Sequence, residues 1–217
     1  MTATKGLFEA RNGRDVLQLV LAQPLTWVVS GEGDSFRATL LPVRPLSDPD
    51  GTVVSLVGHF ARSNDHLAFL RQTPRAAMLV LGPHGYISPS WMNDRTQAPT
   101  WNYASVQFLA ELEFFEDPQQ IEAHLHDLVA AMEAGRPRRW RAQEMGPRYQ
   151  SLAQRVIGFR ARVCAVRAKF KLGQDERDDV FRDIMAGLEQ PSQHDELLEW
   201  MRLFNAREGA TLEEPHG

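Results

Sequence analysis

The residues with the clearest capacity for chemistry lie in one stretch, from Gly82 to Tyr103. It holds two of the five tryptophans and two of the three tyrosines, together with many hydroxyl and amide side chains. Pro83, Pro89 and Pro99 restrict the residues before them and remove backbone donors, so we expect an extended but irregular segment. Flat aromatic rings beside short polar groups suit a planar heteroaromatic ligand. An aromatic-rich structural loop is the alternative, and composition favours neither interpretation.

A second candidate site lies where the segment Gly58–Asn64 passes from a predicted strand into a predicted short helix. A strand that ends at a capped helix leaves free backbone N–H groups near Arg62, and this combination can hold an anion. The motif is weak by itself, because many strand–helix junctions share it. Four arginines around a tryptophan, in the segment Arg136–Arg141, could also hold phosphate. A solvated loop is the simpler interpretation of that basic segment.

Hydrophobic periodicity defines the elements that must position these residues. Asn12 and Asp117 are predicted helix N-caps, and Pro24 and Gly135 mark helix ends. The predicted strands cover residues 25–30, 36–43, 52–60, 75–81, 100–115 and 158–171, and the predicted helices cover residues 12–22, 64–72, 118–135, 148–156, 176–188 and 194–205. Alternating strands with intervening helices favour an α+β fold, in which a mainly antiparallel sheet closes into a small barrel with peripheral helices. The last eight residues are expected to be frayed.

Length and composition set further bounds. The 217 residues form one large domain with a helical appendage, which we divide into residues 1–190 and residues 191–217. No apolar run reaches the roughly 18–20 residues of a membrane span, and the N-terminus lacks the apolar core of a signal peptide. The single cysteine, Cys164, excludes an internal disulfide framework and indicates a cytoplasmic protein; its apolar surroundings predict burial. A net charge of −4 argues against non-specific binding of nucleic acid.

Several familiar catalytic and binding motifs are absent from the sequence. It contains no P-loop, no GxGxxG after a strand, no CxxC, no HExxH and no GxSxG elbow. His124 and His126 are two residues apart on a predicted helix, so they point to different sides and no metal pair is expected. No helix-turn-helix is recognisable, and the terminal helices are acidic, which makes direct reading of DNA unlikely.

Five segments together resemble the PaiB-type family of FMN-binding negative transcriptional regulators. They are Gly58–Asn64, Gly82–Trp91, Pro99–Tyr103, Val156–Phe159 and Lys169–Gln174, which occur in the family's order. The resemblance covers about residues 15–190, and its most specific pieces are Tyr-Ile-Ser-Pro-Ser-Trp and Pro-Thr-Trp-Asn-Tyr. It implies the FMN-binding split-barrel fold, to which the sequence pattern adds a helical C-terminal tail. It also implies a homodimer with the flavin site at the subunit interface.

The resemblance also implies which residues bind FMN. Arg62, Asn64 and the start of the following helix would face the phosphate, whereas the central stretch and the last strand would approach the flavin. The implied cofactor-binding set is Arg62, Asn64, Ser88, Trp91, Thr100, Trp101, Asn102, Lys169, Lys171 and Gln174. A lysine in this position can pair with phosphate or stabilise negative charge near the isoalloxazine ring.

This sequence departs from the family pattern at three places. The family's Tyr-x-Pro element is missing from residues 1–8, and its His-Leu-Pro is Leu40-Leu-Pro42 here. The family's Lys-Leu-Ser-Gln-Asn is replaced by Lys171-Leu-Gly-Gln-Asp175. If the last two changed side chains contact the FMN phosphate, each change is expected to weaken binding by roughly 1–3 kcal/mol.

Three functions follow as alternatives. The first is a regulator that senses FMN or a small ligand, without contacting DNA directly. The second is an FMN-dependent oxidoreductase, such as a flavin reductase or a pyridoxamine-phosphate-oxidase-like enzyme, whose chemistry the flavin would carry. The third is a split barrel that has lost its cofactor and survives as an interaction module. No residue can be named as an essential acid or base, so the catalytic residues stay unknown.

Overall fold

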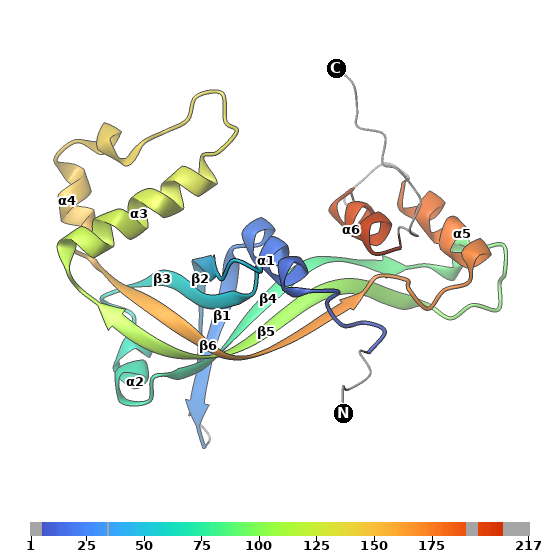
Figure 1. Ribbon diagram of the computed structural model, residues 1–217, viewed down its shortest axis with the longest axis horizontal. Coiled ribbons are helices and arrows are strands. Elements are labelled where there is room, and N and C mark those ends of the chain that lie inside the picture. Colours follow the sequence, from blue (N-terminus) through green and yellow to red (C-terminus); the bar gives the residue numbers. More distant parts are fainter. Residues whose placement is uncertain (1–5, 34, 190–194, 206–217) are drawn as a thin grey trace. The chain divides into compact units, whose positions relative to one another are not determined.

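The computed structural model describes residues 6–33, 35–189 and 195–205 of the chain. Within these ranges, strands and helices follow the order shown in Figure 1. The strands are β1 (Leu25–Glu32), β2 (Ser35–Ser47), β3 (Val53–Ala61), β4 (Arg75–Ile87), β5 (Thr100–Phe115) and β6 (Val156–Lys171). The helices are α1 (Gly13–Ala22), α2 (His66–Gln72), α3 (Pro118–Met132), α4 (Arg148–Ala153), α5 (Asp178–Leu188) and α6 (Asp195–Asn205), with short 3-10 helices at Pro89–Trp91 and Ala142–Met145.

The six strands close into a barrel in the order β1-β2-β3-β6-β5-β4. β1 and β2 form an antiparallel hairpin, and β1 also pairs antiparallel with β4, where Trp27 lies opposite Leu79. β3 pairs antiparallel with both β2 and β6, so that Val57 lies between Arg44 and Arg160. The predicted α+β fold with a mainly antiparallel barrel is therefore confirmed.

Local signals place the first helix and α3 where they were predicted. The Asn12 side chain accepts a hydrogen bond of 2.9 Å from the backbone N–H of Arg14 and caps α1. Asp117 caps α3 in the same way, through a hydrogen bond of 3.0 Å from the N–H of Gln120. Gly135 follows α3 with φ near +76°, a conformation that glycine adopts without steric cost.

The barrel interior is built from the inward-facing positions of its strands. Val28, Val43, Leu56, Phe60 and Phe159 have no exposed surface. Removing one such side chain from water contributes roughly 1.5–3 kcal/mol to stability. Because neighbouring strand residues alternate between faces, the same strands leave their other positions free to line the outside of the barrel.

The described chain divides into two compact units. The barrel unit comprises residues 11–80 and 106–168, and therefore α1 to α4 and most of the strands. The second unit comprises residues up to 10, 81–105 and those from 169 onward, with the ends of β4, β5 and β6 and the helices α5 and α6. In that unit Phe170 stacks on Trp200 and Phe204, with ring centroids 5.7 and 4.8 Å away. The boundary proposed at residue 190 stays a prediction, and the residues expected to be frayed lie outside the described ranges.

Two sequence-based expectations need correction. Cys164 is exposed, not buried, because the inward alternation of β6 ends near Ala161 and the four residues from Cys164 to Arg167 are all exposed. β4 continues to Ile87 where we expected it to end at Leu81, since a proline fits extended backbone and removes only one donor.

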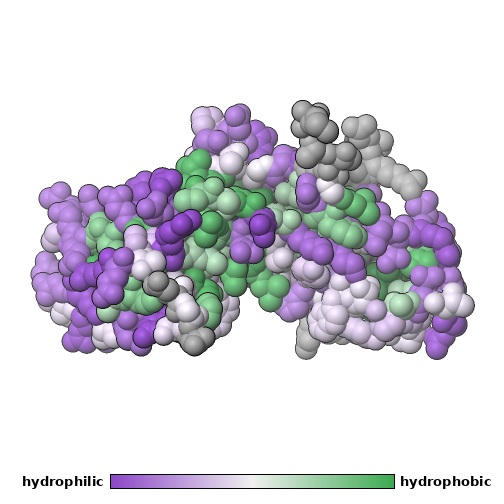
Figure 2. All heavy atoms as spheres, turned by 90° about the horizontal axis from the view of Figure 1, so that it is seen from below, coloured by the Kyte–Doolittle hydropathy of each residue, from purple (hydrophilic) through white to green (hydrophobic). Residues whose placement is uncertain are grey.

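Figure 2 shows apolar surface among polar residues on the face it presents. No described helix is long and apolar enough to cross a membrane.

Candidate functional site

An exposed group of rings stands out in the second unit. His84 and Tyr86 lie on β4, and Trp101 lies on β5. The His84 and Trp101 rings are stacked with centroids 6.4 Å apart, and Tyr86 meets Trp101 edge to face at 6.0 Å. Trp101 is 54% exposed and Tyr86 is 44% exposed, although aromatic residues of this size are mostly buried. We call His84, Tyr86 and Trp101 the aromatic platform, because it offers ring faces to a planar ligand.

Lys171 places a positive charge beside this platform. Its Nζ donates hydrogen bonds to the hydroxyl of Thr100 and to the backbone oxygen of Trp101, the latter at 3.2 Å. An ammonium group has three donors, so one remains for a ligand. The structure therefore brings together three of the predicted cofactor-binding residues.

The turn after β6 is held by Gln174 and Gly173. The Gln174 side chain accepts a 2.7 Å hydrogen bond from the N–H of Leu172 and donates one of 2.5 Å to the backbone oxygen of Phe170. Gly173 has φ near +84°, where a serine would be strained. Glycine, which stands here in place of the family's serine, is thus the residue that this left-handed backbone conformation favours.

Three other predicted residues make mainly structural contacts in the same unit. The Ser88 and Ser90 hydroxyls are 2.6 Å apart, and the Ser88 oxygen also caps the 3-10 helix that follows. Trp91 packs directly against Gly187 of α5, where any side chain would collide with its indole. Asn102 is only 1% exposed, and its amide contacts the sulfur of Met201 at 3.7 Å.

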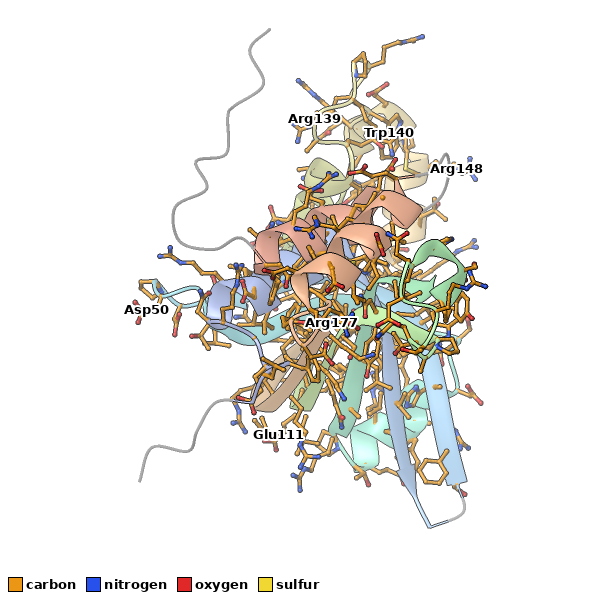
Figure 3. The ribbon with its side chains drawn as sticks, turned by 90° about the vertical axis from the view of Figure 1, so that its right-hand side faces the viewer. Asp50, Glu111, Arg139, Trp140, Arg148 and Arg177 are labelled. Atoms are coloured by element: carbon orange, nitrogen blue, oxygen red, sulfur yellow. The ribbon has the colours of Figure 1, made fainter. Side chains whose placement is uncertain are left out.

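Asp94 fixes the loop between the 3-10 helix and β5. Its carboxylate accepts hydrogen bonds from the backbone and hydroxyl of Thr96, from Gln97 and from Arg177 at the start of α5. The bonds from Thr96, followed by the one from Arg177, hold the pKa of Asp94 well below its usual value. Arg177, labelled in Figure 3, also pairs with Asp179. The loop is therefore anchored to α5 by an ion-pair network.

Arg62 and Asn64 belong to the barrel unit, and both already have protein partners. Arg62 pairs with Glu116 at 2.5 Å and donates to the backbone oxygen of Gln154 at 3.0 Å. Arg71 contacts the other Glu116 oxygen at 2.6 Å, so two guanidinium groups share one carboxylate and leave a net positive charge. The hydrogen bond from Arg62 is the main reason that the pKa of Glu116 is lowered.

The remaining predicted residues have local roles. The Asn64 side chain accepts a 3.0 Å hydrogen bond from the N–H of His66 and thereby supports the first turn of α2. The Lys169 ammonium lies 5.9 Å from the centre of the Phe8 ring, within reach of a cation–π contact. In the predicted basic segment, Arg139 donates to the backbone oxygen of Ala130 at 3.1 Å; Figure 3 labels it with Trp140 on the loop after α3.

The predicted cofactor-binding set leaves out the first two members of the aromatic platform, although both lie in the stretch that was singled out as a candidate ligand site. His84 and Tyr86 lie two positions apart, which on a strand places both on one face. That spacing was available in the sequence, but we expected the strand to end at Leu81, so the alternation was not applied there. Trp101, by contrast, was among the predicted residues.

The chain belongs to the "Putative FMN-binding domain" family. The family model described as "FMN_bind_2: Putative FMN-binding domain" matches residues 4–165. Among curated proteins, the chain is 26% identical over 183 residues to "Protease synthase and sporulation protein PAI 2" of Bacillus subtilis, covering 84% of this chain and 86% of the relative. The predicted resemblance to the PaiB type is thereby confirmed.

Solved structures share the fold. The "FAD and Heme binding protein from Mycobacterium smegmatis" aligns with a TM-score of 0.57 and 17% identity, covering 82% of this chain and 80% of that one. The "Flavocytochrome Anf3 from Azotobacter vinelandii" aligns with a TM-score of 0.54 and 15% identity, covering 74% and 68%. At these identities the likeness establishes the split-barrel architecture alone.

Proposed function

We propose that the protein binds FMN at the aromatic platform, with Lys171 beside the flavin or its phosphate. One observation carries this proposal. Trp101 is exposed, and the Lys171 ammonium donates a hydrogen bond to the backbone oxygen of Trp101. A planar ring with an anionic part matches a ring face next to a fixed cation. Bound FMN would supply electron or hydride transfer, and the platform and Lys171 would hold and orient it.

The role that we propose for FMN binding is regulation of the PaiB type. Its support is the family membership and the similarity to the sporulation protein of Bacillus subtilis. The net charge of −4 disfavours direct contact with DNA phosphates, so we propose that regulation acts through a small ligand or a protein partner.

We further propose that the protein is a homodimer with the flavin site at the subunit interface. On the outer face of the barrel, Leu40, Trp27 and Leu79 lie in one row across β2, β1 and β4, because Trp27 is the register partner of both leucines. These side chains are 39%, 47% and 38% exposed. An apolar row of this kind is typical of a surface that a partner covers. Trp27→Glu should yield monomers in sedimentation, whereas Val54→Glu, at another exposed apolar position on β3, should not.

The test of FMN binding is the visible spectrum of the purified protein after FMN addition and gel filtration. We expect retained flavin bands with one FMN per subunit. Lys171→Met should weaken binding by roughly 10–100-fold, the worth of one charge-assisted hydrogen bond. Arg167→Met, which removes a positive charge from the same strand at a residue outside the predicted cofactor-binding set, is the matched control and should change little. A colourless protein that does not hold added FMN would contradict the proposal.

A second assay separates regulation from enzymatic redox chemistry. The FMN-loaded protein is mixed with NADH or NADPH, and oxidation is compared with that by free FMN. A rate equal to that of free FMN is expected for a regulator. A much faster rate would favour the oxidoreductase alternative instead.

A further inference from the structure

A cavity of about 430 Å³ lies in the barrel unit, between α3 and the outer face of the sheet. Its walls come from β2, β3, β5, β6 and α3, all within that unit. None of its lining residues belongs to the ten predicted to bind FMN. The volume falls in the range of small-molecule sites.

Two arginines line the sheet side of the cavity. Arg44 on β2 and Arg160 on β6 are both register partners of Val57 on β3, so the three residues form a row on one face of the sheet. With neighbouring strands about 4.8 Å apart, the two arginine Cα atoms are separated by roughly 10 Å. Guanidinium groups on either side of a small apolar residue can converge on one carboxylate.

Two carboxylates line the same cavity, Glu113 from β5 and Asp127 from α3. Within the described part of the chain, neither carboxylate and neither arginine of the cavity forms an ion pair within 4.0 Å or a side-chain hydrogen bond. This contrasts with Arg162, two residues beyond Arg160, which is paired with Glu111. The cavity therefore holds two positive and two negative groups that do not neutralise one another directly.

One lining residue of the cavity, His124, contacts a second histidine, His59. His59 Nδ1 lies 3.0 Å from His124 Nε2, and the two rings meet edge to face. His124 is 6% exposed and also lies against the Phe115 ring, which covers Gly158 so closely that any side chain there would collide with it. When neutral, such a pair shares one proton and leaves one donor and one acceptor. It adds polarity to the cavity without adding net charge.

We propose that this cavity is a second ligand site, which takes a small zwitterion of the α-amino-acid class. Arg44 and Arg160 bind its carboxylate, and Glu113 and Asp127 bind its ammonium group. Phe115 and Val57 supply the apolar contact. The proposal does not depend on FMN binding, because it uses different residues.

The first experiment uses the wild-type protein and calorimetric titration with each of the twenty common L-amino acids. We expect a subset to bind with one-to-one stoichiometry. The tightest of these is then compared with its N-acetyl form, which lacks the ammonium, and its carboxamide, which lacks the carboxylate. Each derivative should bind at least roughly 10-fold more weakly, since each loses charge-assisted hydrogen bonds. Binding of the N-acetyl form as tight as that of the parent would overturn the zwitterion assignment in favour of a plain anion site.

The second experiment locates the site. Arg160→Met should weaken binding of the same amino acid roughly 10-fold or more, as should Asp127→Asn. Arg162→Met removes the same side chain from the same strand but outside the cavity, and should leave the affinity unchanged. Far-ultraviolet circular dichroism confirms that each variant is folded. If no amino acid binds the wild type, or if Arg160→Met and Arg162→Met behave alike, the proposal is wrong.

Discussion

The part-buried contact between His59 and His124 predicts a specific loss of stability in mild acid. Burial, and then the neighbouring His59, lower the pKa of His124 to about 4, and burial also lowers the pKa of His59. Asp127, on the same helix, acts in the opposite direction. The other charged groups of the cavity are Arg44, Arg160 and Glu113. Both rings are thus neutral in the folded protein at neutral pH.

The sign follows from proton linkage. In the unfolded chain a histidine has a pKa near 6.5, so below that pH the unfolded state binds a proton that folded His124 does not. Stability is therefore complete above about pH 6.5 and falls as the pH drops toward the folded pKa of about 4. The maximum slope is about 1.4 kcal/mol per pH unit, and protonation is incomplete near both pKa values. Over roughly two units, His124 therefore accounts for a loss of at least about 2 kcal/mol between pH 7 and pH 4.5.

The assay is urea unfolding, followed by circular dichroism at both pH values, for the wild type and for His124→Gln. Glutamine can donate to His59 but does not titrate, so the variant should lose about 2 kcal/mol less than the wild type over this interval. His126→Gln is the matched control, because His126 lies on the same helix but beside Glu122 and Tyr149. Equal pH dependence in the wild type and His124→Gln would refute the reasoning.

Three further predictions concern packing and buried polar contacts. Gly187→Ala should destabilise the protein by about 1–3 kcal/mol, because the new methyl group collides with Trp91. This cost exceeds the gain from alanine's higher helix propensity. An unchanged denaturation midpoint would contradict the prediction. Gly158→Ala should lower the free energy of unfolding by a similar amount, because the new methyl group displaces the Phe115 ring. NMR should show altered chemical shifts for that ring, and unaltered chemical shifts would argue against the close contact. His66→Leu should cost about 2–4 kcal/mol, since its ring nitrogens lie 2.6 and 3.0 Å from the Ser30 and Thr39 hydroxyls and both contacts would be lost. The Thr39 hydroxyl would keep its contact with Asn64, so most of the cost arises at the buried Ser30. Thermal unfolding measures this, and a loss below about 1 kcal/mol would show that the Ser30 hydroxyl finds another partner.

The parts of the fold that depend on local chemistry were predictable from the sequence. Asn12 and Asp117 fixed two helix starts because a capping side chain bonds to a backbone group only two or three residues away. The bounds of β5 were also predicted correctly, since every second residue from Asn102 to Leu112 is buried. These signals need no knowledge of the tertiary structure.

The parts that depend on distant contacts were not predictable. His59 and His124 meet across 65 positions, and no spacing in the sequence encodes that contact. The exposure of Cys164 depends on what covers β6, whereas the apolar pattern describes only the strand itself. Of the predicted cofactor residues, Lys171, Thr100 and Trp101 meet in one place. The FMN-binding role of the set stays a prediction, because resemblance assigns positions and not contacts.

Closure of the barrel determines how a partner can recognise this protein. Each described strand has a neighbour on both sides along part of its length, and β3 pairs only with Val43–Ser47 of the long strand β2. Where a strand is paired on both sides, a partner cannot add a strand, so recognition there must use side chains. Single substitutions on the outer faces can therefore replace one partner with another while the backbone remains unchanged.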